Sequence, residues 1–165
     1  MRLQQARKGS RSMYLAIIIL SMFVLPVTSM GIEHAHLHGA ASWMMLAGKW
    51  FVFWGAGVRL AGAGIRQCLQ PQFTAREIFQ MKTEEALPII REHGIGNLAI
   101  GTAGFVSQWV PSFIVPVALV AVIAYGAWGT LHLMSKGRST SENIAMVSDF
   151  WLAAVLVAYL VHTWA

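Results

Sequence analysis

The chain has 165 residues, of which 56% are hydrophobic and only 12% are charged, and its mean hydropathy is +0.58. A soluble domain carries about 25% charged residues, so this composition excludes an ordinary soluble protein and favours an integral membrane protein. The formal charge of +5 is spread over separate loops, which argues against a nucleic-acid partner. The single cysteine, Cys68, excludes an internal disulfide and a CxxC redox motif.

Five apolar runs have the length of about 20 residues that a helix needs to cross a bilayer. Backbone polar groups in lipid must be hydrogen-bonded within their own segment, and no alternation of period two suggests a barrel, so the runs are predicted to be helices. We therefore expect an all-α fold with one membrane domain, residues 1–165, built as a helical bundle in the lipid bilayer. The predicted transmembrane helices are 13–30, 43–65, 88–110, 112–134 and 146–164.

The first run has a second interpretation. Residues 1–29 combine a basic region, an apolar region, the helix breaker Pro26 and a small-residue ending at Val27 to Ser29, which is also the pattern of a cleaved signal peptide. Cleavage would leave four transmembrane helices. The stretch EHAHLHG, Glu33 to Gly39, is expected on the outer side of the membrane in both cases.

Lysine and arginine set the expected orientation, because short cytoplasmic loops collect them. If five helices cross in turn, the N-terminus, the loop after the second span and the connection before the fifth lie on one side and hold most basic residues. We therefore expect a multi-pass membrane protein with its N-terminus in the cytoplasm and its C-terminus outside. The residues concerned are Arg2, Arg7, Lys8, Arg11, Arg66, Arg76, Lys82, Arg91, Lys136 and Arg138.

The segment between the second and third spans is too charged to cross the membrane. Thr74 followed by Glu77 has the spacing of a capping box, in which two side chains satisfy the free amides of a first helical turn. A short amphipathic helix at about 75–87 is therefore predicted along the cytoplasmic face, with Ile78 and Phe79 turned toward lipid.

The third span carries small and polar residues at steps of three and four, so they share one face of the helix. Helices in lipid associate through small residues, which allow close approach, and through polar side chains. The second span repeats the pattern, so these two helices are predicted to pack together. The predicted seam consists of Gly55, Gly62, Gly94, Asn97, Gly101, Gly104 and Gln108.

Arg59 is a charge inside the second span. It lies about six residues from the end of that span, or ~9 Å deep at 1.5 Å per residue, where a charge is costly unless it finds a partner. Glu92 and Asp149 are the predicted partners, and His93 and His132 lie at the same level. The cluster is interpreted either as an ion-pair network that fixes helix register or as a proton or anion site.

The stretch EHAHLHG places His34, His36 and His38 at every second position. Alternate residues of an extended segment point the same way, and zinc or copper accepts imidazole ligands. A metal site is therefore one interpretation. The others are a pH-responsive cap, because imidazole titrates near neutral pH, and a polar loop without further role.

The stretch EHGIGNLAIGTAGFVS, Glu92 to Ser107, resembles the motif of a family of small bacterial DoxX-like membrane proteins: an acidic residue before a glycine, Asn-Leu-Ala, and a Gly-x-x-Gly helix. The resemblance covers residues 50–160 in helix order and loop length. It implies a four-helix membrane bundle, here with an extra N-terminal span or signal. Relatives in the wider group include small subunits associated with membrane sulfur and quinone oxidoreductases, and the family implies no catalytic residues.

No nucleophile with its base, phosphate-binding loop or pair of catalytic carboxylates is recognisable, so no catalytic residue is predicted. We expect a small accessory or scaffold subunit of a larger inner-membrane assembly, of respiratory or redox type, whose partner is a membrane protein or a second copy of the chain. Two alternatives stay open. One is a small transporter or channel that uses the cluster around Arg59, and the other is a metal-handling protein that binds copper or zinc through His34, His36 and His38.

Overall fold

The structure is a computed structural model, and it describes residues 12–79 and 81–165. Every regular element in these ranges is a helix and none is a strand, so the predicted all-α class is confirmed for them. The basic residues Arg2, Arg7, Lys8 and Arg11, on which part of the orientation prediction rests, lie outside the described residues.

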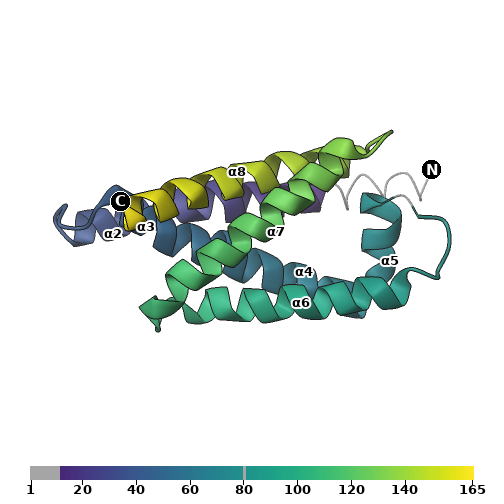
Figure 1. Ribbon diagram of the computed structural model, residues 1–165, viewed down its shortest axis with the longest axis horizontal. Coiled ribbons are helices and arrows are strands. Elements are labelled where there is room, and N and C mark those ends of the chain that lie inside the picture. Colours follow the sequence, from purple (N-terminus) through teal and green to yellow (C-terminus); the bar gives the residue numbers. More distant parts are fainter. Residues whose placement is uncertain (1–11, 80) are drawn as a thin grey trace.

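Long helical segments run along one common axis (Figure 1). The first helix, Ser12–His36, contains the π-helical segment η1 (Leu20–Val24) and α2 (Leu25–His36). A second continuous helix is formed by α3 (Trp43–Phe51), η2 (Val52–Val58) and α4 (Arg59–Leu69). The remaining long helices are α6 (Leu87–Val106), α7 (Ile114–Met134), which follows the turn η4 (Pro111–Phe113), and α8 (Thr140–Trp164).

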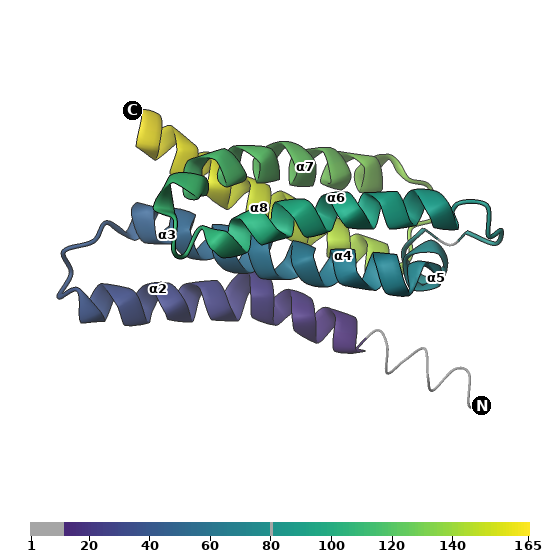
Figure 2. The same cartoon turned by 90° about the horizontal axis from the view of Figure 1, so that it is seen from below.

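The helices pack in antiparallel pairs. α4 lies along α6 and α7 lies along α8, while the first helix lies against α3 and η2 on the opposite side of the bundle from α6 (Figure 2). The apolar core lies between the first helix, η2, α7 and α8. Its fully buried side chains include Met22, Val52, Ala121, Leu152 and Leu156.

Three helices of the described chain are long and apolar enough to cross a membrane: Ser12–His36, Pro111–Met134 and Thr140–Trp164. Their outward faces are apolar as well, and Ile123 and Val161 are 64% and 61% exposed. An exposed apolar surface of this extent is unfavourable in water and suits lipid. These helices are consistent with a membrane protein.

The helices at the second and third predicted spans are less apolar. The helix formed by α3, η2 and α4 contains Lys49, Arg59 and Arg66, and α6 carries Arg91 and Glu92 close to its start. Both have helical geometry throughout, but their charged residues lower their hydropathy.

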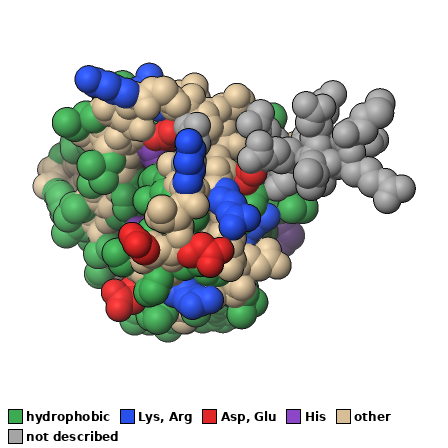
Figure 3. Space-filling model, turned by 90° about the vertical axis from the view of Figure 1, so that its right-hand side faces the viewer, with side chains coloured by type: hydrophobic (Ala, Val, Ile, Leu, Met, Phe, Trp, Pro, Cys, Tyr) green, Lys and Arg blue, Asp and Glu red, His purple; other side chains and the backbone are tan. Residues whose placement is uncertain are grey.

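Charged side chains gather at one end of the bundle. Figure 3 shows lysine, arginine, aspartate and glutamate side chains on the end where α5 lies in Figure 1. We call this the charged end. It includes residues 71–79, 81–86 and 135–139, of which Arg76, Lys82 and Lys136 are exposed. The opposite end carries the C-terminus and the turn at 37–39, and we call it the histidine end.

The predicted helix at 75–87 is wrong in its bounds, because the structure has helical residues at 71–78. The helical residues are α5 (Pro71–Phe73) and η3 (Thr74–Ile78), while 81–82 are irregular and 83–86 form a bend and a turn. The helix starts earlier because Pro71 occupies the first helical position, where its fixed φ is favourable. Thr74 lies inside the helix and is buried, so the capping-box interpretation is wrong.

The first helix is tied to the rest of the bundle by side-chain hydrogen bonds. Pro26 has no N–H to give the carbonyl of Met22, four residues earlier, and the Trp151 indole of α8 donates to that oxygen at 3.1 Å. Glu33 accepts from Lys49 and from the Trp50 indole, both at 2.6 Å. Thus Lys49 is paired inside the protein.

Candidate functional site

The close contact of η2 and α4 with α6 positions the site. A Cβ added at Gly104 would lie 2.7 Å from the backbone nitrogen of Gly57, and one added at Gly64 would lie 2.6 Å from the carbonyl oxygen of Gly94. Both distances are too short for a real methyl group, so only glycine fits. Gly101 meets the backbone of α4 in the same way, at Ala61.

Polar side chains cross this contact. The amide of Asn97 in α6 donates to the Gln67 side-chain oxygen in α4 at 2.8 Å, and both residues are buried. The structure therefore brings the predicted Gly94, Asn97 and Gly101 of α6 against α4, and Gly104 against Gly57 of η2.

Three residues of the predicted seam lie elsewhere. Gly55 faces Leu152 of α8, and its carbonyl accepts from the Tyr125 hydroxyl at 2.8 Å. Gly62 has nothing within 4 Å of an added Cβ and borders a cavity, and Gln108 lies beyond the end of α6. The glycines that meet α6 are Gly57 and Gly64, and they have the same spacing of seven residues as the predicted Gly55 and Gly62. Spacing alone therefore does not determine which pair faces α6.

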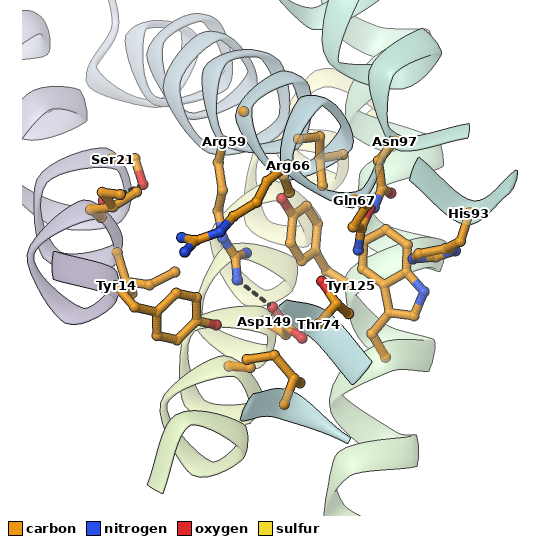
Figure 4. Close-up of a pocket in the computed structure, with 18 of the residues that line it drawn as sticks. Tyr14, Ser21, Arg59, Arg66, Gln67, Thr74, His93, Asn97, Tyr125 and Asp149 are labelled. Carbon is orange, nitrogen blue, oxygen red and sulfur yellow. Dashed lines mark hydrogen bonds and ion pairs between the residues drawn. The ribbon is translucent and has the colours of Figure 1, made fainter. Parts of the chain in front are cut away.

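A cavity of about 400 Å³ lies between the first helix, α4, α7 and α8, toward the charged end (Figure 4). Most of its wall is apolar. Its polar lining groups come from six helical segments, namely the first helix, α4, η3, α6, α7 and α8: Tyr14, Ser21, Arg59, Arg66, Gln67, Thr74, His93, Asn97, Tyr125, His132 and Asp149.

Arg59 is held by α8 on one side. Its Nη2 donates to Asp149 Oδ1 at 3.0 Å and to Ser148 Oγ at 3.1 Å, and the guanidinium lies 5.0 Å from the centre of the Tyr125 ring. The side chain of Arg59 is 11% exposed and that of Asp149 is 4% exposed. The other terminal nitrogen, Nη1, is buried and has no hydrogen-bond partner among the described residues.

A second pair continues the network along α8. His132 Nδ1 lies 3.3 Å from Glu142 Oε1, and His132 Nε2 lies 4.0 Å from Asp149 Oδ2. All three side chains are buried. The imidazole therefore stands between two carboxylates, and the polar groups link α4, α7 and α8 near the charged end.

Two members of the predicted cluster stand apart from Arg59. Glu92 is exposed on α6 and does not line the cavity. His93 lines the cavity, where its ring packs edge-on against Trp128 with centroids 5.4 Å apart. The structure thus gathers Arg59, His132 and Asp149, leaves His93 at the wall, and places Glu92 outside.

Arg66 is a site residue that the sequence interpretation did not single out. It follows Arg59 by seven residues, which is the spacing that returns to the same face of a helix after two turns. Its guanidinium packs over Phe73, with 3.5 Å from Cζ to the ring centre, and its buried Nε has no hydrogen-bond partner in the described chain. Figure 4 shows both arginines directed into the cavity.

The mouth of the cavity is mostly apolar. Five lining residues are exposed on the outside of the bundle, Gly62 and His93 among them, and the other three are large apolar side chains: Ile17 by 46%, Phe79 by 48% and Leu131 by 65%. These three come from the first helix, the segment after η3, and α7. The cavity therefore opens mainly between apolar side chains, with His93 also at the surface, and not through a ring of charges.

The histidine stretch does not form an extended segment. The first helix continues through His36, and 37–39 form a turn in which His38 has a φ of 49°. His34 Nδ1 lies 3.1 Å from the Ala41 carbonyl oxygen and its ring stacks on Trp43, while His36 and His38 are exposed. Within residues 12–79 and 81–165, no three His, Cys, Asp or Glu side chains are arranged to hold a metal ion.

Comparison of the chain with protein-family models, curated proteins and solved structures finds no match.

Proposed function

We propose that this chain is a five-span protein of the bacterial inner membrane that binds a small ligand beside Arg59, as an accessory subunit of a larger membrane assembly. The observation that carries the ligand site is the buried Arg59 Nη1, which borders a cavity and lacks a partner among the described residues. Leaving a buried charged donor unpaired costs roughly 1–3 kcal/mol or more. A ligand that accepts this hydrogen bond would remove that cost.

The size and lining of the cavity support the same proposal. Ligand pockets commonly have volumes of about 300–1,000 Å³, mostly apolar walls and a few convergent polar groups. The cavity beside Arg59 has about 400 Å³ and meets this description. It lies among helices and not on a loop, so its polar groups are held in place by packing.

The test uses a variant that fills the cavity without changing a charge. Gly62 borders the cavity and has open space around it, so Gly62→Leu should occupy the ligand volume. Gly96→Leu is the matched control, because Gly96 is exposed on α6 and also has open space. Native mass spectrometry of protein purified from its own membrane should show a bound non-protein mass in the native protein and in the control, but not in Gly62→Leu.

The proposal of five spans rests on helix length and on charge distribution. The helices Trp43–Leu69 and Leu87–Val106 are long enough to accompany the three apolar ones, and their charged residues lie near helix ends or inside the bundle. Basic residues gather at the charged end, which by the positive-inside tendency faces the cytoplasm. The segment Pro71–Ile78 would then lie at the cytoplasmic surface.

The accessory role is supported by the small size of the chain, 18.1 kDa, and by the extent of its exposed apolar surface. The resemblance of residues 92–107 to DoxX-like proteins points the same way. A channel receives no support, because the bundle beyond the cavity toward the histidine end is filled by core side chains such as Val52 and Leu156. The placement of His36 and His38 gives no support to metal handling.

A further inference from the structure

We infer that the cavity beside Arg59 takes a single-chain lipid anion, with its acidic head on Arg59 and Arg66 and its hydrocarbon tail along the apolar wall. The inference rests on the proposed function, since it requires the cavity to be a ligand site. The head is a carboxylate or a phosphate monoester, carried on one alkyl chain.

The free polar atoms define the head group. Arg59 Nη1 and Arg66 Nε are both buried and lack partners in the described chain. A guanidinium donates hydrogen bonds and accepts none, so the ligand must bring acceptor oxygens. Neither a primary amine nor a quaternary ammonium meets this requirement.

The charges around the cavity favour an anionic head over a neutral one. Asp149 neutralises Arg59 at 3.0 Å, and Glu142 faces His132, away from the cavity lining. Arg66 packs against Phe73 and has no carboxylate partner among the described residues. Its charge is therefore left for a ligand, and charge-assisted hydrogen bonds to a guanidinium are the strong ones.

The walls and the mouth define the tail. Apolar side chains from the first helix, α4, η3 and α7 line the space: Ile17, Ile18, Leu60, Ile78 and Leu131. Because Ile17, Phe79 and Leu131 are also exposed on the apolar outside of the bundle, a tail can pass from the cavity into the surrounding lipid. The ligand would then enter from the membrane.

The volume favours one chain. About 400 Å³ is near the lower end of the range of about 300–1,000 Å³ for ligand pockets. A space of this volume suits one hydrocarbon chain better than two.

The test measures binding to the full chain in a nonionic detergent that contains no other anionic lipid. Palmitate and hexadecyl phosphate are titrated at mildly alkaline pH, beside methyl palmitate and hexadecyltrimethylammonium, which carry the same chain length without a negative charge. Native mass spectrometry gives the bound fraction and hence Kd. Arg66→Gln is the test variant, and Arg76→Gln is its control, because Arg76 is an exposed arginine of the same end that does not line the cavity.

We expect one palmitate or hexadecyl phosphate per chain, with the tighter of the two identifying the head, and no saturable binding of the ester or the ammonium compound. Arg66→Gln should weaken binding about 10- to 100-fold, the loss expected for one charged hydrogen bond, while Arg76→Gln should leave Kd unchanged. Gly62→Leu should abolish it.

Two results would overturn the inference. Equal binding of methyl palmitate and palmitate, blocked by Gly62→Leu, would keep the ligand site but reject the anionic head. An unchanged Kd in Arg66→Gln would likewise reject the assigned head contact. If no probe binds and the native protein also carries no ligand mass, the proposed function fails together with the inference.

Discussion

Arg59 and Asp149 carry opposite charges in a part of the bundle from which water is largely excluded. Asp149→Asn would leave the Arg59 guanidinium uncompensated, and losing one member of a buried pair costs about 3–5 kcal/mol. The double variant Arg59→Leu, Asp149→Leu should recover most of this loss, because it buries no charge. The free energy of unfolding, measured by denaturing-detergent titration in mixed micelles, tests both values. Equal loss in the single and double variants would contradict a charge pair.

The sequence predicted this pair for a physical reason: an arginine within an apolar run needs a carboxylate at the same depth. It also predicted Glu92 as a partner, because Glu92 lies at the same depth as Arg59. Depth along a helix does not determine the direction in which a side chain points around the helix axis. Glu92 is exposed on α6, whereas Ser148, adjacent to Asp149, contacts Arg59. Arg66 could have been predicted from its spacing, because it follows Arg59 by seven residues and therefore lies on the same face of the helix.

At the level of elements, α6 contacts the backbone of the helix formed by η2 and α4, so a single methyl group at a glycine of this contact should destabilise the bundle. Gly104→Ala would place Cβ 2.7 Å from the Gly57 backbone, which cannot move as a side-chain tip can. We expect a loss of about 1–3 kcal/mol in unfolding free energy, as for other overpacked positions.

Gly96→Ala is the control for that prediction, since nothing lies within 4 Å of its added Cβ on the same helix. It should leave stability unchanged or raise it slightly, because alanine is the better helix former. Comparable losses in both variants would show that helix propensity, and not the contact with η2, governs the effect.

The sequence predicted best the helices that coincide with long apolar runs. The helix ends that it missed are set by local hydrogen bonds of capping residues. α8 begins at Thr140, before the predicted 146, because Ser139 accepts a hydrogen bond from the Glu142 amide and caps the helix. The segments η1 and η2 carry no such signal. A π-helical turn shifts every later side chain around the helix axis, so the face that Gly57 and Gly64 present to α6 was not readable from spacing.

At the scale of the whole molecule, the single cysteine gives a direct test of topology. Cys68 lies near the end of α4, at the charged end, and is partly exposed. A membrane-impermeant maleimide should therefore label it in inside-out vesicles and not in intact cells. The reverse control is His36→Cys in a Cys68→Ser background, at the exposed histidine end, which should be labelled from outside. Labelling of Cys68 in intact cells would reverse the proposed orientation.

The first helix is predicted to stay in the mature protein. It supplies Tyr14 and Ser21 to the cavity, and its buried Met22 contributes to the core and accepts from the Trp151 indole. Cleavage after Ser29 would remove one wall of the proposed site, leave the indoles of Trp54 and Trp151 without their present partners, and expose core to lipid.

The intact mass of protein purified through a C-terminal tag should accordingly include residues 1–29. A second measurement isolates the contact itself: Trp151→Phe should lower the free energy of unfolding by about 1–3 kcal/mol, since Pro26 gives the Met22 carbonyl no replacement donor. In a Pro26→Ala background the backbone N–H of residue 26 becomes able to donate, so the cost of Trp151→Phe should shrink. A mature chain that begins at Met30 and still binds its ligand would contradict a site built with the first helix, because the remaining helices would then have to close the cavity alone.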